Sequence, residues 1–129
     1  MSELLITDLG EVILTEDKIL RIRLLIDDEI TLEKTRQHYI KVHDYPGENL
    51  RCGVLLNTRD VNLYRIKPEV MSYQADNEFS KYPLGMAVLV NSRVVKQLFT
   101  MFNMVYRPTV VTRVFTDEEL AKEWLRSLM

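Results

Sequence analysis

The sequence predicts an α/β fold in which an N-terminal β-hairpin is followed by four strand–helix units, wound as a right-handed superhelix around a mainly parallel sheet. Three observations lead to this prediction. Short apolar runs fill the first third of the chain, later runs lack polar alternation, and each later run precedes a segment with helical periodicity. The 129 residues are 47% hydrophobic and 28% charged, which fits one domain spanning residues 1–129.

The first elements are extended. Two apolar runs, at residues 4–7 and 11–15, flank a glycine-containing turn and predict the hairpin. A longer strand follows at residues 18–26, where aliphatic residues alternate with Arg21 and Arg23. A period of two places both arginines on the face opposite the core. Part of that face of the sheet is therefore expected to meet water.

Strand and helix then alternate to the end of the chain. The predicted strands lie near residues 18–26, 51–56, 86–90 and 110–114, and the helices near residues 31–45, 68–81, 92–106 and from 116 onward. Crossovers between parallel strands are nearly always right-handed, hence the expected superhelix. Thr116 and Glu119 have the spacing of a capping box for the last helix, and Phe115 and Leu120 that of a hydrophobic staple.

Three segments carry a family resemblance: VLLNTRDV at residues 54–61, MAVLVNS at 86–92, and TRVFTDEE with the following Ala121 and Trp124-Leu125. Together they resemble the STAS domain, named for sulphate transporters and anti-sigma-factor antagonists. The chain is most similar to small stand-alone bacterial STAS-like proteins of unassigned function. The resemblance implies a regulatory or apolar-ligand role and names no partner.

The turn after residues 51–56 departs from the antagonist pattern. In the anti-sigma antagonists a serine in an Asp-Ser-Ser-Gly turn is phosphorylated, whereas this chain has Asn57-Thr58-Arg59-Asp60. Thr58 is the one residue of this turn that could accept a phosphate, and a switch centred on it is one alternative function. The other interpretation is that Asn57 and Thr58 only close the strand and turn the chain.

Composition excludes several classes of function. A net charge of -2 and a pI near 5.7 give no positive surface of the kind that binds nucleic acid. No apolar run approaches the ~20 residues that span a bilayer, and the N-terminus lacks the features of a signal peptide. With Cys52 as the one cysteine, an intrachain disulfide is impossible. We expect a cytoplasmic protein without a nucleic-acid partner or a transmembrane segment.

Residue patterns typical of catalysis are missing. His38 and His43 are five residues apart, so on a helix they diverge and predict no metal site. Cys52 lies in a strand predicted to be buried, where a thiol is inert. Acidic clusters at helix starts complement the helix dipole, and no glycine-rich phosphate loop is present. We expect no catalytic residue, no metal and no cofactor.

Polar residues follow several predicted strands at the edge where ligands bind in open α/β sheets. This polar rim consists of Asn57, Thr58, Arg59, Asn91, Ser92, Arg93 and Thr116. Two arginines and a helix N-terminus suit a phosphate or a carboxylate. Plain capping and solvation explain the same residues, and a small enzyme using the rim is a second alternative function.

The helix at residues 92–106 has apolar residues over too wide an arc for one buried stripe. We predict that its core face is filled by Val94, Val95, Leu98, Phe102 and Val105. The apolar residues then left for the surface are Phe99, Met101, Met104 and Tyr106. A large exposed apolar patch marks an interface or a lipid contact, and methionine suits adaptable surfaces. Deep burial under the hairpin or a neighbouring helix is the alternative.

These observations favour a non-enzymatic regulatory or interaction module that binds a protein partner or a small or apolar ligand. Its expected partner is a second copy, in a homodimer formed through the helix at residues 92–106.

Overall fold

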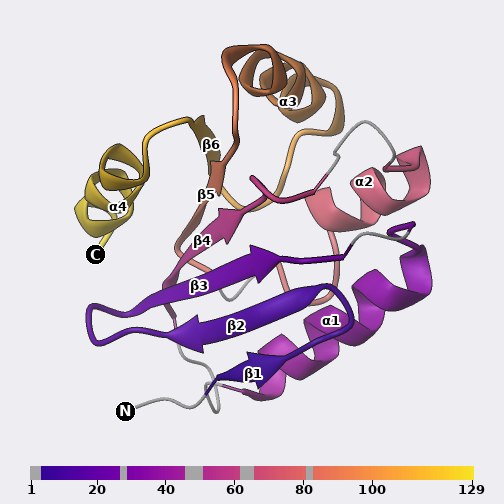
Figure 1. Cartoon of the computed structure of the whole chain (residues 1–129), viewed down its shortest axis with the longest axis horizontal. Coiled ribbons are helices and arrows are strands. Elements are labelled where there is room, and N and C mark those ends of the chain that lie inside the picture. The colour runs from indigo at the N-terminus through magenta and orange to yellow at the C-terminus, as the bar shows by residue number, and fades with distance from the viewer. Residues whose placement is uncertain (1–3, 27–28, 46–50, 62–65, 81–82) are drawn as a thin grey trace.

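The structure is a computed structural model that describes residues 4–26, 29–45, 51–61, 66–80 and 83–129. Its elements follow the predicted order (Figure 1). The strands are β1 (Leu5–Ile6), β2 (Gly10–Leu14), β3 (Ile19–Leu24), β4 (Gly53–Asn57), β5 (Gly85–Leu89) and β6 (Thr112–Phe115). The helices are α1 (Leu32–Asp44), α2 (Pro68–Ala75), α3 (Arg93–Tyr106) and α4 (Glu118–Ser127).

All the described strands form one sheet in the order β1-β2-β3-β4-β5-β6. The first three pair antiparallel, and β3, β4, β5 and β6 pair parallel. The predicted hairpin is thus an antiparallel meander whose last strand begins the parallel part. This arrangement confirms the α/β fold of four strand–helix units predicted from the sequence.

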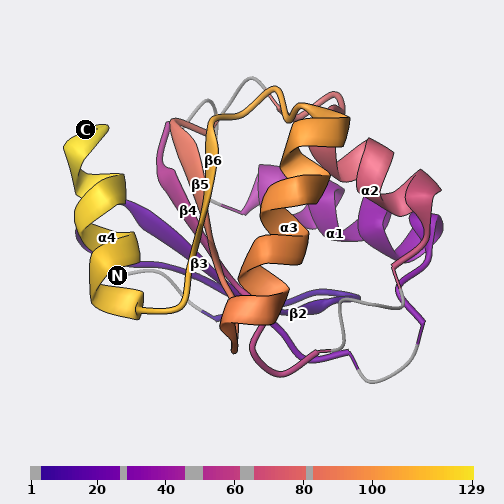
Figure 2. The same ribbon diagram turned by 90° about the horizontal axis from the view of Figure 1, so that it is seen from above.

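The helices lie on both faces of the sheet. Figure 2 shows α1, α2 and α3 together on one face and α4 alone on the other. The larger core, under α1–α3, includes Val12, Ile22, Leu56, Val88 and Phe99, and the smaller one, under α4, includes Leu55, Leu89, Phe115 and Leu125. On its face of the sheet, α4 packs against β4, β5 and β6.

The strand patterns explain these layers. In β3, Leu20, Ile22 and Leu24 are buried, whereas Arg21 and Arg23 lie on the opposite face, as the alternation predicts. Successive side chains of β4 and β5 point alternately into the two cores, so both faces of these strands are buried. Continuous apolar runs are what a strand covered on both sides requires.

The start of α4 differs from the prediction. Asp117, not Thr116, is its N-cap, and the Asp117 carboxylate accepts hydrogen bonds from the backbone N–H groups of Glu119 (2.8 Å) and Leu120 (3.2 Å). Leu120 is exposed rather than stapled to Phe115. An aspartate one residue further along caps equally well and brings a negative charge to the helix dipole.

Helix α2 is shorter than predicted and ends at Ala75 instead of near residue 81. Asn77 turns the chain there. Its side-chain Nδ2 donates to the Tyr73 carbonyl oxygen at 2.9 Å, and its Oδ1 accepts from the Phe79 backbone N–H at 2.8 Å. Such local side-chain bonds to the backbone compete with the helical ladder.

Candidate functional site

Three of the predicted rim residues meet at the carboxyl ends of β4 and β5. The side-chain Oδ1 of Asn57 accepts hydrogen bonds from the backbone N–H and the Nε of Arg59, both at 3.1 Å. Asn91 Nδ2 donates to the Arg59 carbonyl oxygen at 3.3 Å. These amides hold the turn after β4 in place, and each of these bonds stays within the rim itself.

Thr58 is turned away from this rim. Its side chain is 2% exposed, and its Oγ1 and its backbone N–H both donate to the Leu89 carbonyl oxygen, at 2.9 Å. The hydroxyl therefore links the end of β4 to the end of β5. A kinase would reach it only after this edge had opened, so the geometry gives no support to a phosphorylation switch at Thr58.

The other rim residues serve local structure or face solvent. Ser92 is the N-cap of α3, and its Oγ accepts from the Val95 backbone N–H at 3.2 Å. Arg93 and Thr116 are exposed. Within the described ranges, no hydrogen bond joins Arg93 or Thr116 to the Asn57–Arg59–Asn91 group. Of the seven predicted residues, hydrogen bonds therefore join three, Asn57, Arg59 and Asn91.

A charged cluster that the sequence did not reveal lies beside the rim. The carboxylate of Glu118, at the start of α4, contacts Arg21 Nη2 at 3.1 Å, Arg59 Nη2 at 3.2 Å and Lys122 Nζ at 3.2 Å. Arg21 comes from β3 and is 97 residues away in the chain. Nothing local in the sequence pairs them, because the contact depends on α4 packing beside the outer face of β3.

The ionised carboxylate of Glu118 holds this cluster together. Partial burial raises the pKa of Glu118, but hydrogen bonding and charge from Lys122 and Arg21 outweigh it and leave the pKa below its ordinary value. Glu118 is therefore ionised near neutral pH and shares its charge among three cations. A carboxylate in this setting joins β3, the β4 turn and α4; it is poorly suited to act as a general acid or base.

Two further titratable candidates, His38 and Cys52, are buried. His38 is 4% exposed, its Nδ1 lies 2.7 Å from Thr7 Oγ1, and burial lowers its pKa to about 4, so the imidazole is neutral at pH 7. Burial also raises the pKa of the Cys52 thiol, which keeps it protonated and unreactive. Among the described residues, no three His, Cys, Asp or Glu side chains are grouped as a metal site requires.

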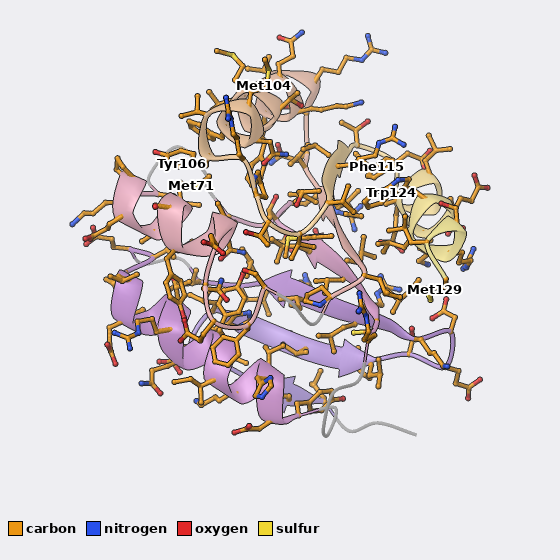
Figure 3. The ribbon with its side chains drawn as sticks, turned by 180° about the vertical axis from the view of Figure 1, so that it is seen from behind. Met71, Met104, Tyr106, Phe115, Trp124 and Met129 are labelled. Atoms are coloured by element: carbon orange, nitrogen blue, oxygen red, sulfur yellow. The ribbon has the colours of Figure 1, made fainter. Side chains whose placement is uncertain are left out.

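Helix α3 carries two parallel apolar stripes with the same 4-3-4 spacing. The inner stripe is Val95, Phe99, Phe102 and Tyr106; the outer stripe is Val94, Leu98, Met101 and Val105. The inner stripe packs against the core under α1–α3. On the outer stripe, Val94 is 67% exposed, Met101 62% and Val105 72%, with Met104 beside them at 73%. In Figure 3, Met104 lies on the outer side of α3 and Tyr106 on the side near α2.

These positions correct the prediction for α3. Phe99 is buried and Tyr106 packs against the core, so neither belongs to an exposed surface. Val94 and Val105, expected in the core, are exposed. The prediction mixed residues from two adjacent stripes, each of which could have turned inward. Met101 and Met104 do lie at the surface.

Two small apolar cavities lie beneath the helices. One, of about 50 Å³, is lined by residues such as Met71, Phe99 and Tyr106; the other, of about 40 Å³, is lined in part by His38 and Thr58. A buried water needs roughly 10–15 Å³ of such space. Each cavity has room for a few water molecules.

Comparison with known proteins gives a fold and a family. No curated protein matches the chain. A crystal structure of an uncharacterised protein of the DUF3478 family with a SpoIIAA-like fold, from Shewanella loihica PV-4, is similar with a TM-score of 0.61 and 12% identity, covering 97% of this chain and 95% of that one. At this identity the similarity shows the fold alone, and it confirms the STAS-like fold predicted from the sequence.

No helix in the described ranges is long and apolar enough to cross a membrane. The family whose sequence pattern matches is described as a domain of unknown function, DUF7793, and the match covers residues 13–129. The chain therefore belongs to the DUF7793 family.

Proposed function

We propose that the chain is a non-enzymatic interaction module that binds a second copy of itself through the outer stripe of α3. The observation that carries this proposal is the exposure of Val94, Met101 and Val105 along the helix, with the half-buried Leu98 between them. Scattered surface leucines or valines need no explanation, whereas a contiguous apolar row marks a contact surface. Methionine is also enriched in protein interfaces.

The spacing of the outer stripe suits packing against another helix. Val94, Leu98, Met101 and Val105 recur as the alternating d and a positions of a heptad do. Position g of the same heptad is occupied by Gln97 and Met104, which are uncharged, so no charge has to be buried at that side of the seam. A second copy offers the same uncharged row, as a two-fold interface requires.

The polar rim supports the non-enzymatic part of the proposal. Asn57, Arg59 and Asn91 hydrogen-bond to one another, and Glu118 is ionised and shared among cations. An enzyme at this edge would need an acid, a base or a nucleophile that converge on free space. The contacts among Asn57, Arg59, Asn91 and Glu118 instead stabilise the fold.

Light scattering across a concentration series tests the self-association. One row of four side chains is a small interface, so we expect a weak, reversible dimer over roughly 10 µM to 1 mM. The mass of the 15.2 kDa chain should rise toward twice that value with concentration. Met101→Glu should keep the chain monomeric, because it places a charge in the apolar seam.

Thr100→Glu is the matched control. Thr100 is exposed on the same helix but off the outer stripe, so this variant adds the same charge and should still dimerise. Circular dichroism should show that both variants fold. A wild-type chain that stays monomeric over the whole range, or a Met101→Glu variant that associates as the wild type does, would contradict the proposal.

A further inference from the structure

Resting on the proposed self-association, we propose that Met101 and Met104 form an oxidation site that regulates it. Hydrogen peroxide converts both thioethers to sulfoxides, and the oxidised chain then remains monomeric. Met101 stands at a d position of the outer stripe, and Met104 stands at the flanking g position. The residues that react are therefore the ones on which the pairing of two copies depends.

Both methionines are open to solvent on the same side of α3. They are three residues apart, which places their Cβ atoms about 5–6 Å from each other. Each is exposed over more than half of its surface, and Figure 3 shows Met104 on the outer side of the helix. An oxidant in solution can therefore reach both side chains of a monomer without local unfolding. Monomers are always present because the proposed pair is weak and reversible.

The other described sulfur-containing side chains are either protected or far from the outer stripe. Met71 is buried under α1–α3, and Met86 packs against the same core. Cys52 is also buried, and its raised pKa keeps it from forming the reactive thiolate. Met129 is exposed, but it follows α4 on the opposite face of the sheet. Peroxide should therefore modify the proposed interface before it modifies the core.

The reaction transfers one oxygen atom to each methionine. The sulfur lone pair attacks one oxygen of hydrogen peroxide, the O–O bond breaks, and the other oxygen leaves as hydroxide. This hydroxide takes up the proton of the transferred oxygen and becomes water. Sulfur is oxidised by two electrons, the peroxide is reduced, and a flexible apolar side chain becomes a polar one.

A sulfoxide in the seam opposes pairing. When two copies meet, the oxygen on Met101 has to be buried among the side chains of the outer stripe, such as Leu98 and Val105, which carry no hydrogen-bond donor. Burying a polar group without a partner costs free energy that burying the thioether does not. We expect the dissociation constant of the pair to rise at least about tenfold.

Limited peroxide treatment followed by light scattering tests this site. The chain is treated with hydrogen peroxide in dilute solution, where it is monomeric, the peroxide is removed, and the concentration series is repeated. Peptide mass spectrometry should show one added oxygen on Met101 and on Met104 before any on Met71 or Met86. The treated chain should stay monomeric at concentrations where the untreated chain dimerises, and circular dichroism should show that it is still folded.

The double variant with Met101→Leu and Met104→Leu is the control. Leucine keeps both positions apolar and does not react with peroxide, while the exposed Met129 remains in place. This variant should dimerise to the same extent before and after treatment. If it loses pairing after treatment, another residue is responsible and the oxidation site is wrong.

The remaining outcomes separate the oxidation site from the self-association. If Met101 and Met104 are oxidised and the treated chain still dimerises as the untreated one does, the regulation fails and the self-association stands. Oxidation of Met71 as fast as that of Met101 would also contradict a site confined to the surface of α3. A chain that is monomeric in light scattering before any treatment overturns both proposals.

Discussion

The inner and outer stripes of α3 have the same spacing and opposite environments. Each inner residue follows an outer residue directly in the sequence, so the two stripes are about 100° apart on the helix. Phe99, on the inner stripe, is 8% exposed, whereas Met101, on the outer one, is 62% exposed. Hydrophobicity alone did not determine which stripe turned inward, because both are fully apolar.

Side-chain size explains the choice. The inner stripe contains Phe99, Phe102 and Tyr106. The ring of Phe102 contacts those of Phe99 and Tyr106 edge to face, with centroids 6.4 Å apart in both contacts. Aromatic side chains bury about 150–250 Å² each, more than valine or methionine offers. The fold gains most by burying the aromatic stripe, and most of the aliphatic stripe is left exposed.

The largest effect on stability is expected when one residue of each stripe is truncated and the two variants are compared. Phe99→Ala is expected to lower the free energy of unfolding by about 4 kcal/mol, because it leaves a cavity in the core. Met101→Ala should change it by less than about 0.5 kcal/mol in dilute, monomeric solution. Urea denaturation at low protein concentration measures both. Equal losses from the two variants would mean that the stripes are not distinct.

This comparison also shows how far the sequence could predict the structure. Alternation in β3 and the continuous apolar runs of β4 and β5 predicted the sheet, because those patterns follow from the backbone geometry of strands. For α3 the same kind of pattern occurred twice, one residue apart. Choosing between the two stripes required knowing which surface of the sheet the helix would meet.

The predicted rim residues are separated by contacts that their sequence positions do not reveal. They were placed correctly at the ends of strands, but sequence position does not tell where a hydroxyl points. Thr58 turned inward to the Leu89 carbonyl oxygen. The contact between Arg21 and Glu118 joins residues far apart in the chain, and only the packing of α4 brings them together.

Acid should lower the free energy of unfolding through the buried His38. The pKa of His38 is about 4 in the folded chain and 6.5 when the side chain is exposed. Between these values the unfolded chain binds a proton that the folded chain excludes, so stability falls as pH drops from 6.5 toward 4. The loss should reach about 3 kcal/mol.

Urea denaturation at pH 7, 6 and 5 measures this loss. His38→Gln can keep the contact with Thr7 and lacks the titration, so its stability should fall less steeply over the same range. If the free energy of unfolding fell equally with pH in the variant and the wild type, the His38 ring would be hydrated, and the interior under α1 would not be dry.

A smaller loss of stability is expected from Glu118, at the start of α4 on the opposite face of the sheet. Glu118→Gln removes the charge shared by Arg21, Arg59 and Lys122, which are partly exposed. We expect a loss of about 1 kcal/mol, and this loss should shrink in high salt, where the charges are screened. Thermal unfolding with and without salt measures it; a loss independent of salt would point to packing instead of charge.

Methyl NMR of the methionines tests most directly whether the outer stripe of α3 is an interface. Met101 and Met104 lie on its exposed side, and Met71 lies in the core under α1–α3. With self-association, the Met101 and Met104 methyl signals should shift as protein concentration rises, while the Met71 signal stays in place. Signals that stay constant at every concentration, or a Met71 shift as large as that of Met101, would contradict an interface on this face.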